Sequence, residues 1–398
     1  IISKTAPTVT GPIDGEGGTA SGIWTLDQAA DYEKQGLWPK PLVPRELWGI
    51  GRNETFGELG IDNGNLDVSS PVQVGALTTW LRSAAGYQHT IFTKSDGTMW
   101  SVGQNTTGQL GLGNTTTYTL PTQIGALTTW SKISSGSYFV IATKTDGTLW
   151  AWGQGSSGKL GQGNTTNYSS PVQVGSLTDW SEIYAAGNAW MAVKTDGTLW
   201  GCGSNSYGVL GQGNTTTYSS PVQVGALTDW AKVACLGDSS LAVKTDGTLW
   251  GIGENNNGQL AQENTTNYSS PVQVGALTDW STIGCGIAAG YGVKTNGTLW
   301  SWGQNWSGPL GLNDSVYRSS PTQVGALTTW TSVMGGDKWA TGVRTDGYLF
   351  GWGYNWLGKL GQGNTTNYSS PKQVGALATW LKSETGPNSH SLFGFKSP

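Results

Sequence analysis

The chain has 398 residues, of which 62 are glycine and 22 are tryptophan, while only 12% are charged. Glycine this frequent without a period of three excludes collagen and fits many tight turns, and the tryptophans supply enough apolar area to exclude a disordered chain. The net charge is −4 and the Lys and Arg residues are scattered, so the clustered positive charge that a nucleic-acid partner requires is absent.

Residues 1–44 precede a repeat that fills the remaining sequence, and we predict that they form a separate arm. Residues 6–22 contain two prolines and a glycine-rich stretch, which favours an extended strap. The stretch from Thr25 to Gln35 is predicted to form a short helix, because Thr25 can cap its first turn and Gly36 can end it.

A repeat of about fifty residues runs from residue 45 to the C-terminus. Each copy has, with small variations, a Leu-Trp strand, a Gly-x-Leu-Gly turn, a Ser-Ser-Pro-x-Gln-Val segment and a closing Gly-Ala-Leu-Thr-x-Trp segment. The closing tryptophans are fifty residues apart: Trp80, Trp130, Trp180, Trp230, Trp280, Trp330 and Trp380. Short alternating segments repeated at this period are typical of strands in an all-β propeller, and seven copies predict seven blades.

Hairpin turns and the two ends of the repeat region predict how the ring closes. Asp-Gly or Asn-Gly stands between two strands at Asp96, Asp146, Asp196, Asp246, Asn296 and Asp346, and we predict two-residue turns in which both central residues have positive φ. The seventh turn is missing, whereas an unmatched Leu-Trp strand stands at Leu47–Gly51. We therefore predict that this N-terminal strand completes the blade begun after Trp380, which removes open sheet edges. The predicted domains are the arm, 1–44, and the propeller, 45–398.

These motifs, Gly-x-Leu-x-x-Trp-Gly, then Gly-x-Leu-Gly-x-Gly, then Pro and a short apolar strand, resemble the regulator of chromosome condensation repeat family over roughly residues 45–398. The resemblance implies a seven-bladed propeller closed by strand exchange. Members of that family include a small-GTPase exchange factor, a plant photoreceptor and a β-lactamase inhibitor protein. They share binding through loops on a rigid ring, so the family does not fix the partner.

Motifs of the common catalytic and metal sites do not occur in the sequence. His89 and His390 are not spaced as metal ligands, and Cys202, Cys235 and Cys285 are expected to be buried packing residues. We therefore expect no enzymatic activity, no cofactor and no metal, with glycan hydrolysis by a central group of carboxylates as the minor alternative. The basic residues beside the turns are predicted to form a solvated rim: Lys94, Lys144, Lys194, Lys244, Lys294 and Arg344.

Aromatic residues that differ between the repeats point to a ligand-binding patch. The predicted ligand-binding residues are Phe56, Trp306, Tyr354, Trp356 and Trp339. Because Phe56, Trp306 and Trp356 fall in consecutive repeats of a closed ring, they are expected to lie in neighbouring loops. Low charge favours aromatic stacking over long-range attraction, so a host-surface glycan is the preferred ligand, ahead of a protein. The alternative is that these rings pack on their own loops.

The segment from Ser21 to Pro39 resembles a short segment of bacteriophage tail and fibre proteins. It implies a non-catalytic structural or binding protein of a phage particle, located in the virion and bound to other virion proteins. The expected partner-binding residues of the arm are Trp24, Leu26, Tyr32 and Trp38. The alternatives are that this helix packs on the propeller, and that the chain is a cellular propeller acting as a protein-interaction scaffold. No run of eighteen apolar residues occurs, so membrane insertion is not expected.

Overall fold

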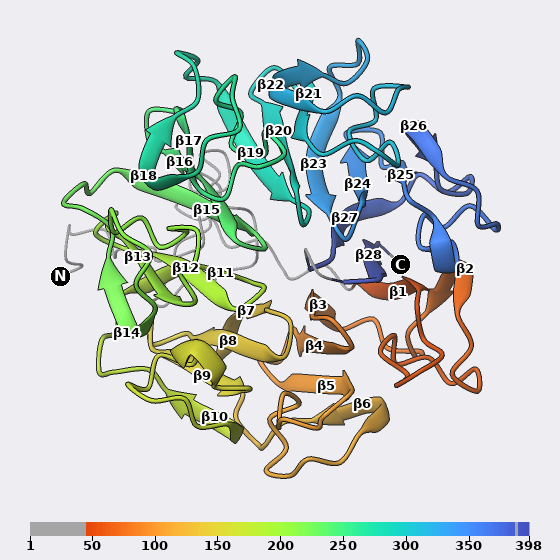
Figure 1. Ribbon diagram of the computed structural model, residues 1–398. Helices are drawn as coiled ribbons and strands as arrows, with labels where there is room; N and C mark the ends of the chain where they lie inside the picture. The colour runs from red at the N-terminus through yellow and green to blue at the C-terminus, as the bar shows by residue number, and fades with distance from the viewer. Residues whose placement is uncertain (1–44, 387–388, 398) are drawn as a thin grey trace, which may run out of the picture. The chain divides into compact units, whose positions relative to one another are not determined.

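A computed structural model describes residues 45–386 and 389–397, which belong to one compact unit beginning at Arg45. Seven four-stranded antiparallel sheets surround a central axis, and each sheet forms one blade (Figure 1). The predicted all-β, seven-bladed propeller is confirmed. Within the described ranges, no helix is long and apolar enough to cross a membrane. The predicted arm and helix before Arg45, with Trp24, Leu26, Tyr32 and Trp38, lie outside the described residues, so that domain division stays a prediction.

Each blade is a meander whose first strand lies nearest the axis. The first strands of the blades are β3 (Trp80–Ala85), β7 (Trp130–Ser135), β11 (Trp180–Ala186), β15 (Trp230–Leu236), β19 (Trp280–Cys285), β23 (Trp330–Gly335) and β27 (Trp380–Glu384). The second strands are β4 (His89–Lys94), β8 (Phe139–Lys144), β12 (Ala189–Lys194), β16 (Ser239–Lys244), β20 (Ala289–Lys294), β24 (Trp339–Arg344) and β28 (Ser391–Lys396). We number the blades 1 to 7 in this order.

The third strands are β5 (Met99–Gly103), β9 (Leu149–Gly153), β13 (Leu199–Gly203), β17 (Leu249–Gly253), β21 (Leu299–Gly303), β25 (Leu349–Gly353) and β1 (Glu46–Gly51). The outer strands are β6 (Tyr118–Gln123), β10 (Tyr168–Gln173), β14 (Tyr218–Gln223), β18 (Tyr268–Gln273), β22 (Arg318–Gln323), β26 (Tyr368–Gln373) and β2 (Val68–Gln73). Two short 3-10 turns, η1 (Ser156–Gly158) and η2 (Trp356–Gly358), lie in the loops before the outer strands of blades 2 and 6.

Blade 7 closes the ring by combining both ends of the repeat region, as predicted. Its strand order is β27, β28, β1 and β2, with Leu47 opposite Phe395 and Ile50 opposite Leu392 across the β1–β28 pair. The side chains of Leu47 and Ile50 point to opposite faces of the sheet and are fully buried. Leu47 packs in the cluster shared with blade 1, and Ile50 packs in the cluster shared with blade 6. One strand therefore joins blade 7 to both of its neighbours.

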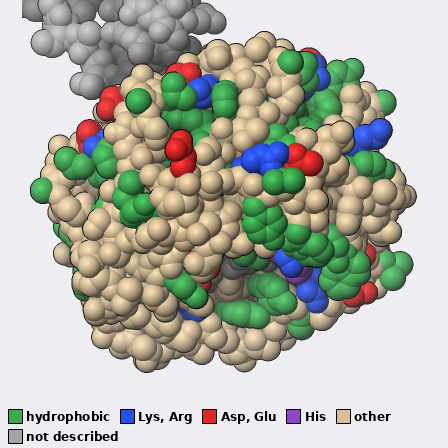
Figure 2. Space-filling model, turned by 45° about the horizontal axis from the view of Figure 1, so that its top comes forward, with side chains coloured by type: hydrophobic (Ala, Val, Ile, Leu, Met, Phe, Trp, Pro, Cys, Tyr) green, Lys and Arg blue, Asp and Glu red, His purple; other side chains and the backbone are tan. Residues whose placement is uncertain are grey.

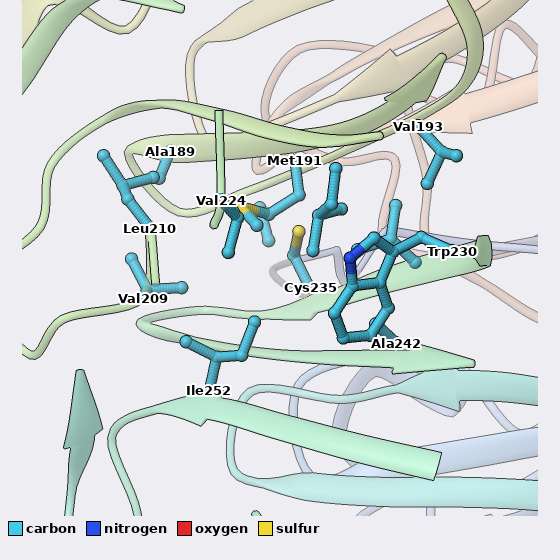
Figure 3. Packing of buried hydrophobic residues seen from close by; sticks show 13 residues of the cluster. Ala189, Met191, Val193, Val209, Leu210, Val224, Trp230, Cys235, Ala242 and Ile252 are labelled. Carbon is cyan, nitrogen blue, oxygen red and sulfur yellow. The ribbon is translucent and has the colours of Figure 1, made fainter. Parts of the chain in front are cut away.

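The hydrophobic core lies between the blades rather than in one central mass. Seven clusters of buried side chains fill the seven interfaces between neighbouring blades. Figure 3 shows the cluster between blades 3 and 4, where Met191 and Leu210 meet Trp230 and Cys235. All three cysteines are buried, and burial raises the pKa of the Cys202 and Cys235 thiols to about 12, which confirms their expected role as packing residues.

The turns between second and third strands differ from the prediction in their backbone conformation. Gly97 has φ +76° and its N–H donates to the Lys94 carbonyl, but Asp96 does not have a positive φ. Asp96 instead accepts hydrogen bonds from the backbone N–H and the hydroxyl of Thr98, and Thr98 accepts one from the Trp100 indole. The side chain thus stabilises a longer turn in which only the glycine needs the left-handed region.

The basic residues before these turns do not form a solvated rim, contrary to the prediction. In blade 1 the Lys94 ammonium lies 3.6 Å from the ring centroid of Trp100 and 4.9 Å from that of Trp80. Lys94 is only 8% exposed, and equivalent stacks occur at Lys144, Lys194, Lys244, Lys294 and Lys396. The indole faces attract the cation, so each lysine fastens the first strand of its blade to the third.

Replacing Ile50 with Ala should lower the free energy of unfolding by about 2–5 kcal/mol, because it opens a cavity at the interface of blades 6 and 7. The matched control, Leu66→Ala in the same blade, should change it by less than about 0.5 kcal/mol, since Leu66 is 65% exposed. Deleting residues 45–51 should cause a larger loss. Urea unfolding followed by tryptophan fluorescence measures all three variants, and a deletion variant that unfolds like the parent chain would contradict the closure.

Candidate functional site

The loop face of the propeller carries the connections from first to second strands and from third to outer strands in every blade. Buried asparagines fix the longer of these loops. In blade 1 the Asn105 amide donates to the Asn114 carbonyl at 3.0 Å, and its Oδ1 accepts from the Leu110 N–H at 2.9 Å. Asn205, Asn255, Asn305 and Asn355 repeat these bonds. The loops therefore have a rigid base, and their tips can vary without loss of the fold.

The residue after this asparagine position is solvent-exposed in all seven loops: Glu54, Thr106, Ser156, Ser206, Asn256, Trp306 and Trp356. Trp306 and Trp356 are 51% and 57% exposed, and they occupy the same position in adjacent blades 5 and 6. The five other positions carry polar side chains. An indole on a rigid and exposed tip contributes little to the core, so a role in binding is the more economical explanation.

Tyr354 and Lys338 extend the exposed indole of blade 5 into a larger surface, and the fully buried Lys359 supports it. The rings of Trp306 and Tyr354 lie 6.1 Å apart, and the Lys338 ammonium lies 5.3 Å from the Trp306 centroid. The Lys359 ammonium lies 5.2 Å from the Tyr354 ring and donates to the Asp337 carbonyl at 3.1 Å. Burial of Lys359 lowers its pKa to about 8. Aromatic and cationic groups from blades 5 and 6 thus meet at one place.

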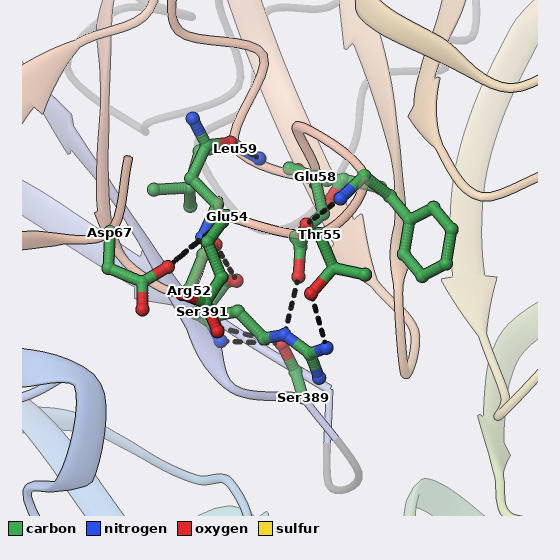
Figure 4. A network of polar contacts seen from close by, with 11 residues as sticks. Arg52, Glu54, Thr55, Glu58, Leu59, Asp67, Ser389 and Ser391 are labelled. Carbon is green, nitrogen blue, oxygen red and sulfur yellow. Dashed lines mark hydrogen bonds and ion pairs between the residues drawn. The ribbon is translucent and has the colours of Figure 1, made fainter. Parts of the chain in front are cut away.

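The loop of blade 7 continues this surface through Phe56, which is half-buried. Its N–H donates to Glu58, and the Arg52 guanidinium pairs with Glu58 at 3.3 Å and donates to the Thr55 hydroxyl at 2.8 Å (Figure 4). Burial raises the pKa of the Glu58 carboxyl, while Arg52 opposes that shift. This network holds the Phe56 loop, and the backbone N–H of Arg52 donates to the His390 carbonyl.

Trp339 does not belong to this surface, contrary to the prediction. It is fully buried in the cluster between blades 6 and 7, and its indole N–H points to the Ser389 carbonyl at 3.4 Å. A fully buried ring cannot contact a ligand without unfolding its surroundings. The structure therefore brings Trp306, Tyr354, Trp356 and Phe56 to consecutive loops, and leaves Trp339 in the core.

A pocket at the axis adds residues that the sequence analysis did not single out. It has a volume of about 340 Å³ and is lined by Tyr87, Tyr138, Ile287, Asp337 and His390, among others. The Tyr87 ring lies 5.7 Å from Tyr138 and 5.7 Å from His390. Figure 2 shows hydrophobic, basic and histidine side chains gathered along one side of a central hollow. These lining residues come from hairpins between first and second strands. In the sequence, only the differences between the seven repeats at these hairpins could have pointed to them.

We call this surface the blade 5–7 sector; it comprises Trp306, Tyr354, Trp356, Lys338, Phe56, Asp337 and His390. The fully buried Lys359 supports Tyr354 and is not part of the surface. Burial and the nearby Lys359 lower the pKa of His390 to about 4, so the imidazole is neutral near pH 7. No group of three or more His, Cys, Asp or Glu residues that could hold a metal occurs in the described ranges. The groups brought together suit stacking, cation–π contacts and hydrogen bonds with a partner.

The sequence and the structure were compared with those of known proteins, and the family of the chain follows from the sequence. The model of the regulator of chromosome condensation (RCC1) repeat matches residues 96–143, 146–193, 196–243, 246–288, 296–340 and 346–392, more than half of the chain. The chain belongs to the RCC1 repeat family. Each match begins at or next to the turn between second and third strands, so each spans halves of two blades. This offset agrees with a ring whose seventh repeat is split between β28 and β1.

Individual relatives are more distant. The RCC2 homolog of Xenopus laevis is 36% identical over 75 residues, which is 19% of this chain and 14% of that protein. The crystal structure of Prp20p from Saccharomyces cerevisiae superposes with a TM-score of 0.78 at 18% identity, over 89% of this chain and 92% of Prp20p. Human WBSCR16 superposes with a TM-score of 0.79 at 19% identity, over 89% and 99% of the two chains. The two superpositions show a shared fold.

The predicted location in a virion is wrong. The matching relative is a frog protein, and the similar structures are those of yeast and human proteins, so the relatives are components of cells rather than of phage particles. The error came from nineteen residues of the arm, which lie outside the described residues, whereas the RCC1 repeats extend over the propeller.

His89→Phe should remove part of the acid sensitivity of the propeller. His89 lies beneath the Tyr87 hairpin, is 1% exposed, and burial lowers its pKa to about 3. Because the unfolded chain binds this proton below about pH 6.5 and the folded chain does not, stability is lost as the pH falls from about 6.5 to 3. The loss from this residue is on the order of 4 kcal/mol. Phe139 occupies the same register position in blade 2, so Phe fits the site.

Urea unfolding at pH 7 and pH 4 measures this effect in the parent chain and in His89→Phe. Carboxylates titrate in both proteins, so their contribution cancels in the comparison. The variant should lose less stability on acidification than the parent chain. Equal losses would show that His89 can be protonated without disturbing the fold.

Proposed function

We propose that this protein is a non-catalytic scaffold that binds another protein through the blade 5–7 sector of its loop face. The observation that carries the proposal is the pair of half-exposed indoles, Trp306 and Trp356, at equivalent tips of adjacent loops whose bases are fixed. Tryptophan and tyrosine on preformed surfaces are the residues that most often dominate the energy of protein interfaces.

The family supports this kind of function. The structure of Prp20p was described together with its binding to Gsp1p and histones, so a propeller of this fold serves as a protein-binding ring in yeast. The electrostatics of the sector also suit a protein partner. Lys338 lies beside the Trp306 ring, and Asp337 lines the adjoining pocket, so both signs of charge are available for a polar rim.

A glycan is the second candidate for the same surface. Exposed indoles such as Trp306 and Trp356 can stack on the apolar face of a sugar, and asparagine, threonine and serine surround them in the loops. A glycan site, however, gives no role to the Lys338 cation, which stacks on Trp306. The protein partner accounts for more of the sector and is therefore preferred.

Changing Trp306 and Trp356 together to Ala should weaken partner binding at least tenfold, since each anchor contributes roughly 1–2 kcal/mol. The matched control is Thr106→Ala with Ser156→Ala, which alters the same loop position in blades 1 and 2. Proteins retained by the immobilised propeller from an extract of its source cells are quantified, and the strongest is purified for titration. Its affinity should fall for the tryptophan variant alone.

The melting temperature of the tryptophan variant should stay within a few degrees of the parent value, because neither indole belongs to a buried cluster. Equal affinities for the two double variants would place the interface elsewhere on the ring. Retention of glycoproteins only in their glycosylated form would favour the glycan candidate.

A further inference from the structure

The lysine stacks on the turn-bearing face allow an internal comparison between blades. In blades 3, 4 and 5 the stacked lysine also pairs with a carboxylate of the segment before its first strand. The Lys194–Asp179, Lys244–Asp229 and Lys294–Asp279 distances are 3.4, 3.3 and 3.3 Å. Each of these blades thus supplies its own anion to a cation that lies almost buried between two indoles.

Blade 1 lacks this anion. Thr79 stands where blades 3 to 5 have Asp179, Asp229 and Asp279, and Lys94 makes no ion pair or side-chain hydrogen bond with any described residue. Burial lowers the pKa of Lys94, and the nearby Asp96 carboxylate partly opposes this shift. The cation therefore has no carboxylate at the position that Asp179, Asp229 and Asp279 fill in blades 3 to 5.

A groove between blades 7 and 1 reaches Lys94. It has a volume of about 530 Å³ and is lined by Lys94, Trp100, Leu77, Leu120 and Ile61, among others. The exposed fractions of Leu77 and Leu120 are 47% and 49%. The groove is thus a largely apolar channel of a size typical of small-molecule sites, with Lys94 as its cationic group and the exposed Asp62 carboxylate also in its lining.

Two departures from the repeat make this groove apolar. After the Leu-Gly of the turn, blades 2, 3 and 6 carry glutamines whose amides bond to the outer strand, whereas blade 7 has Ile61. In the outer strand of blade 1, Leu120 replaces the serine found at Ser170 in blade 2. The equivalent groove between blades 1 and 2 keeps Ser170, is smaller at about 340 Å³, and does not include Lys144 in its lining.

We propose that the groove between blades 7 and 1 binds a small amphipathic carboxylate, whose anionic group pairs with Lys94 and whose apolar body lies along Ile61, Leu77 and Leu120. The carboxylate takes the place that Asp179, Asp229 and Asp279 fill in blades 3 to 5. The aliphatic or aromatic body displaces water from the leucine side chains. This site lies on different loops from the blade 5–7 sector and does not depend on the proposed protein partner.

Octanoate and indole-3-propionate are the probes, with octanol and indole-3-propionamide as matched compounds without the anion. Calorimetric titration reports binding. Both acids should bind at least tenfold more tightly than their neutral partners. The acid that binds more tightly tells whether the natural ligand has an aliphatic or an aromatic body.

Thr79→Asp supplies the missing anion from within the chain and should weaken binding of both acids at least tenfold. Lys94→Met keeps the apolar stack but removes the cation, and should have the same effect. Thr129→Asp, the same change at the equivalent position of blade 2, should alter binding less than twofold. Unchanged melting temperatures show that the three variants are folded.

Three results would overturn the proposal: no binding of either acid at millimolar concentration, equal binding of the acids and their neutral partners, or equal weakening by Thr79→Asp and Thr129→Asp. In each case Lys94 would be a structural residue of the stack and nothing more.

Discussion

Pairing of β1 with β28 is the constraint on which the rest of the structure depends. Each blade buries its two faces only against its neighbours, so a ring with one missing strand would expose the clusters on both sides of blade 7. Leu47 and Ile50 pack in those two clusters from one strand, which makes the N-terminal part of the repeat region indispensable to its C-terminal part.

Closure also completes the sheet of blade 7, so that in each blade only the outer strand has an edge that faces solvent. Loops on such a ring are held from both sides, and this rigidity is what allows single side chains at their tips to form a preorganised surface.

Because the repeats are nearly identical, residues that maintain the fold can be distinguished from residues that are candidates for binding. Positions that recur in most blades, such as the buried asparagine of the long loop and the lysine between two indoles, explain the fold. Positions that differ between blades are not needed for the fold, and both proposed binding sites depend on such positions. Trp306 and Trp356 replace polar residues at exposed tips, whereas Ile61 and Leu120 replace a glutamine and a serine in the lining of a groove. A residue in one blade can thus be compared with the residues at the same position in the other blades.

The sequence predicted the architecture well because a fifty-residue period and an unmatched Leu-Trp strand leave few ways to close a ring. It predicted side-chain environments less well. Lys94 was predicted to face solvent because Trp80 and Trp100 are separated from it along the chain by fourteen and six residues, and only strand pairing brings both rings onto the ammonium.

Trp306 and Trp339 could not be distinguished by residue type, since both depart from the repeat. Burial separates them: one stands on a loop tip, and the other lies in a strand that faces blade 7. The pocket residues Tyr87 and His390 are distant in sequence and meet only because the ring is closed.

Blade 7 links the two proposed sites through its position in the ring. The blade 5–7 sector includes its Phe56 loop, and the groove beside blade 1 includes Ile61, two residues after Leu59 of the closing cluster. This blade also joins the two chain ends, so it has the fewest covalent connections within its sheet. A ligand that binds across blades 7 and 1 contacts groups that are together only in the closed ring, and by mass action it must stabilise that closure. The same holds for a partner that bridges blades 6 and 7. Ligand binding at either site would therefore stabilise the same closed ring.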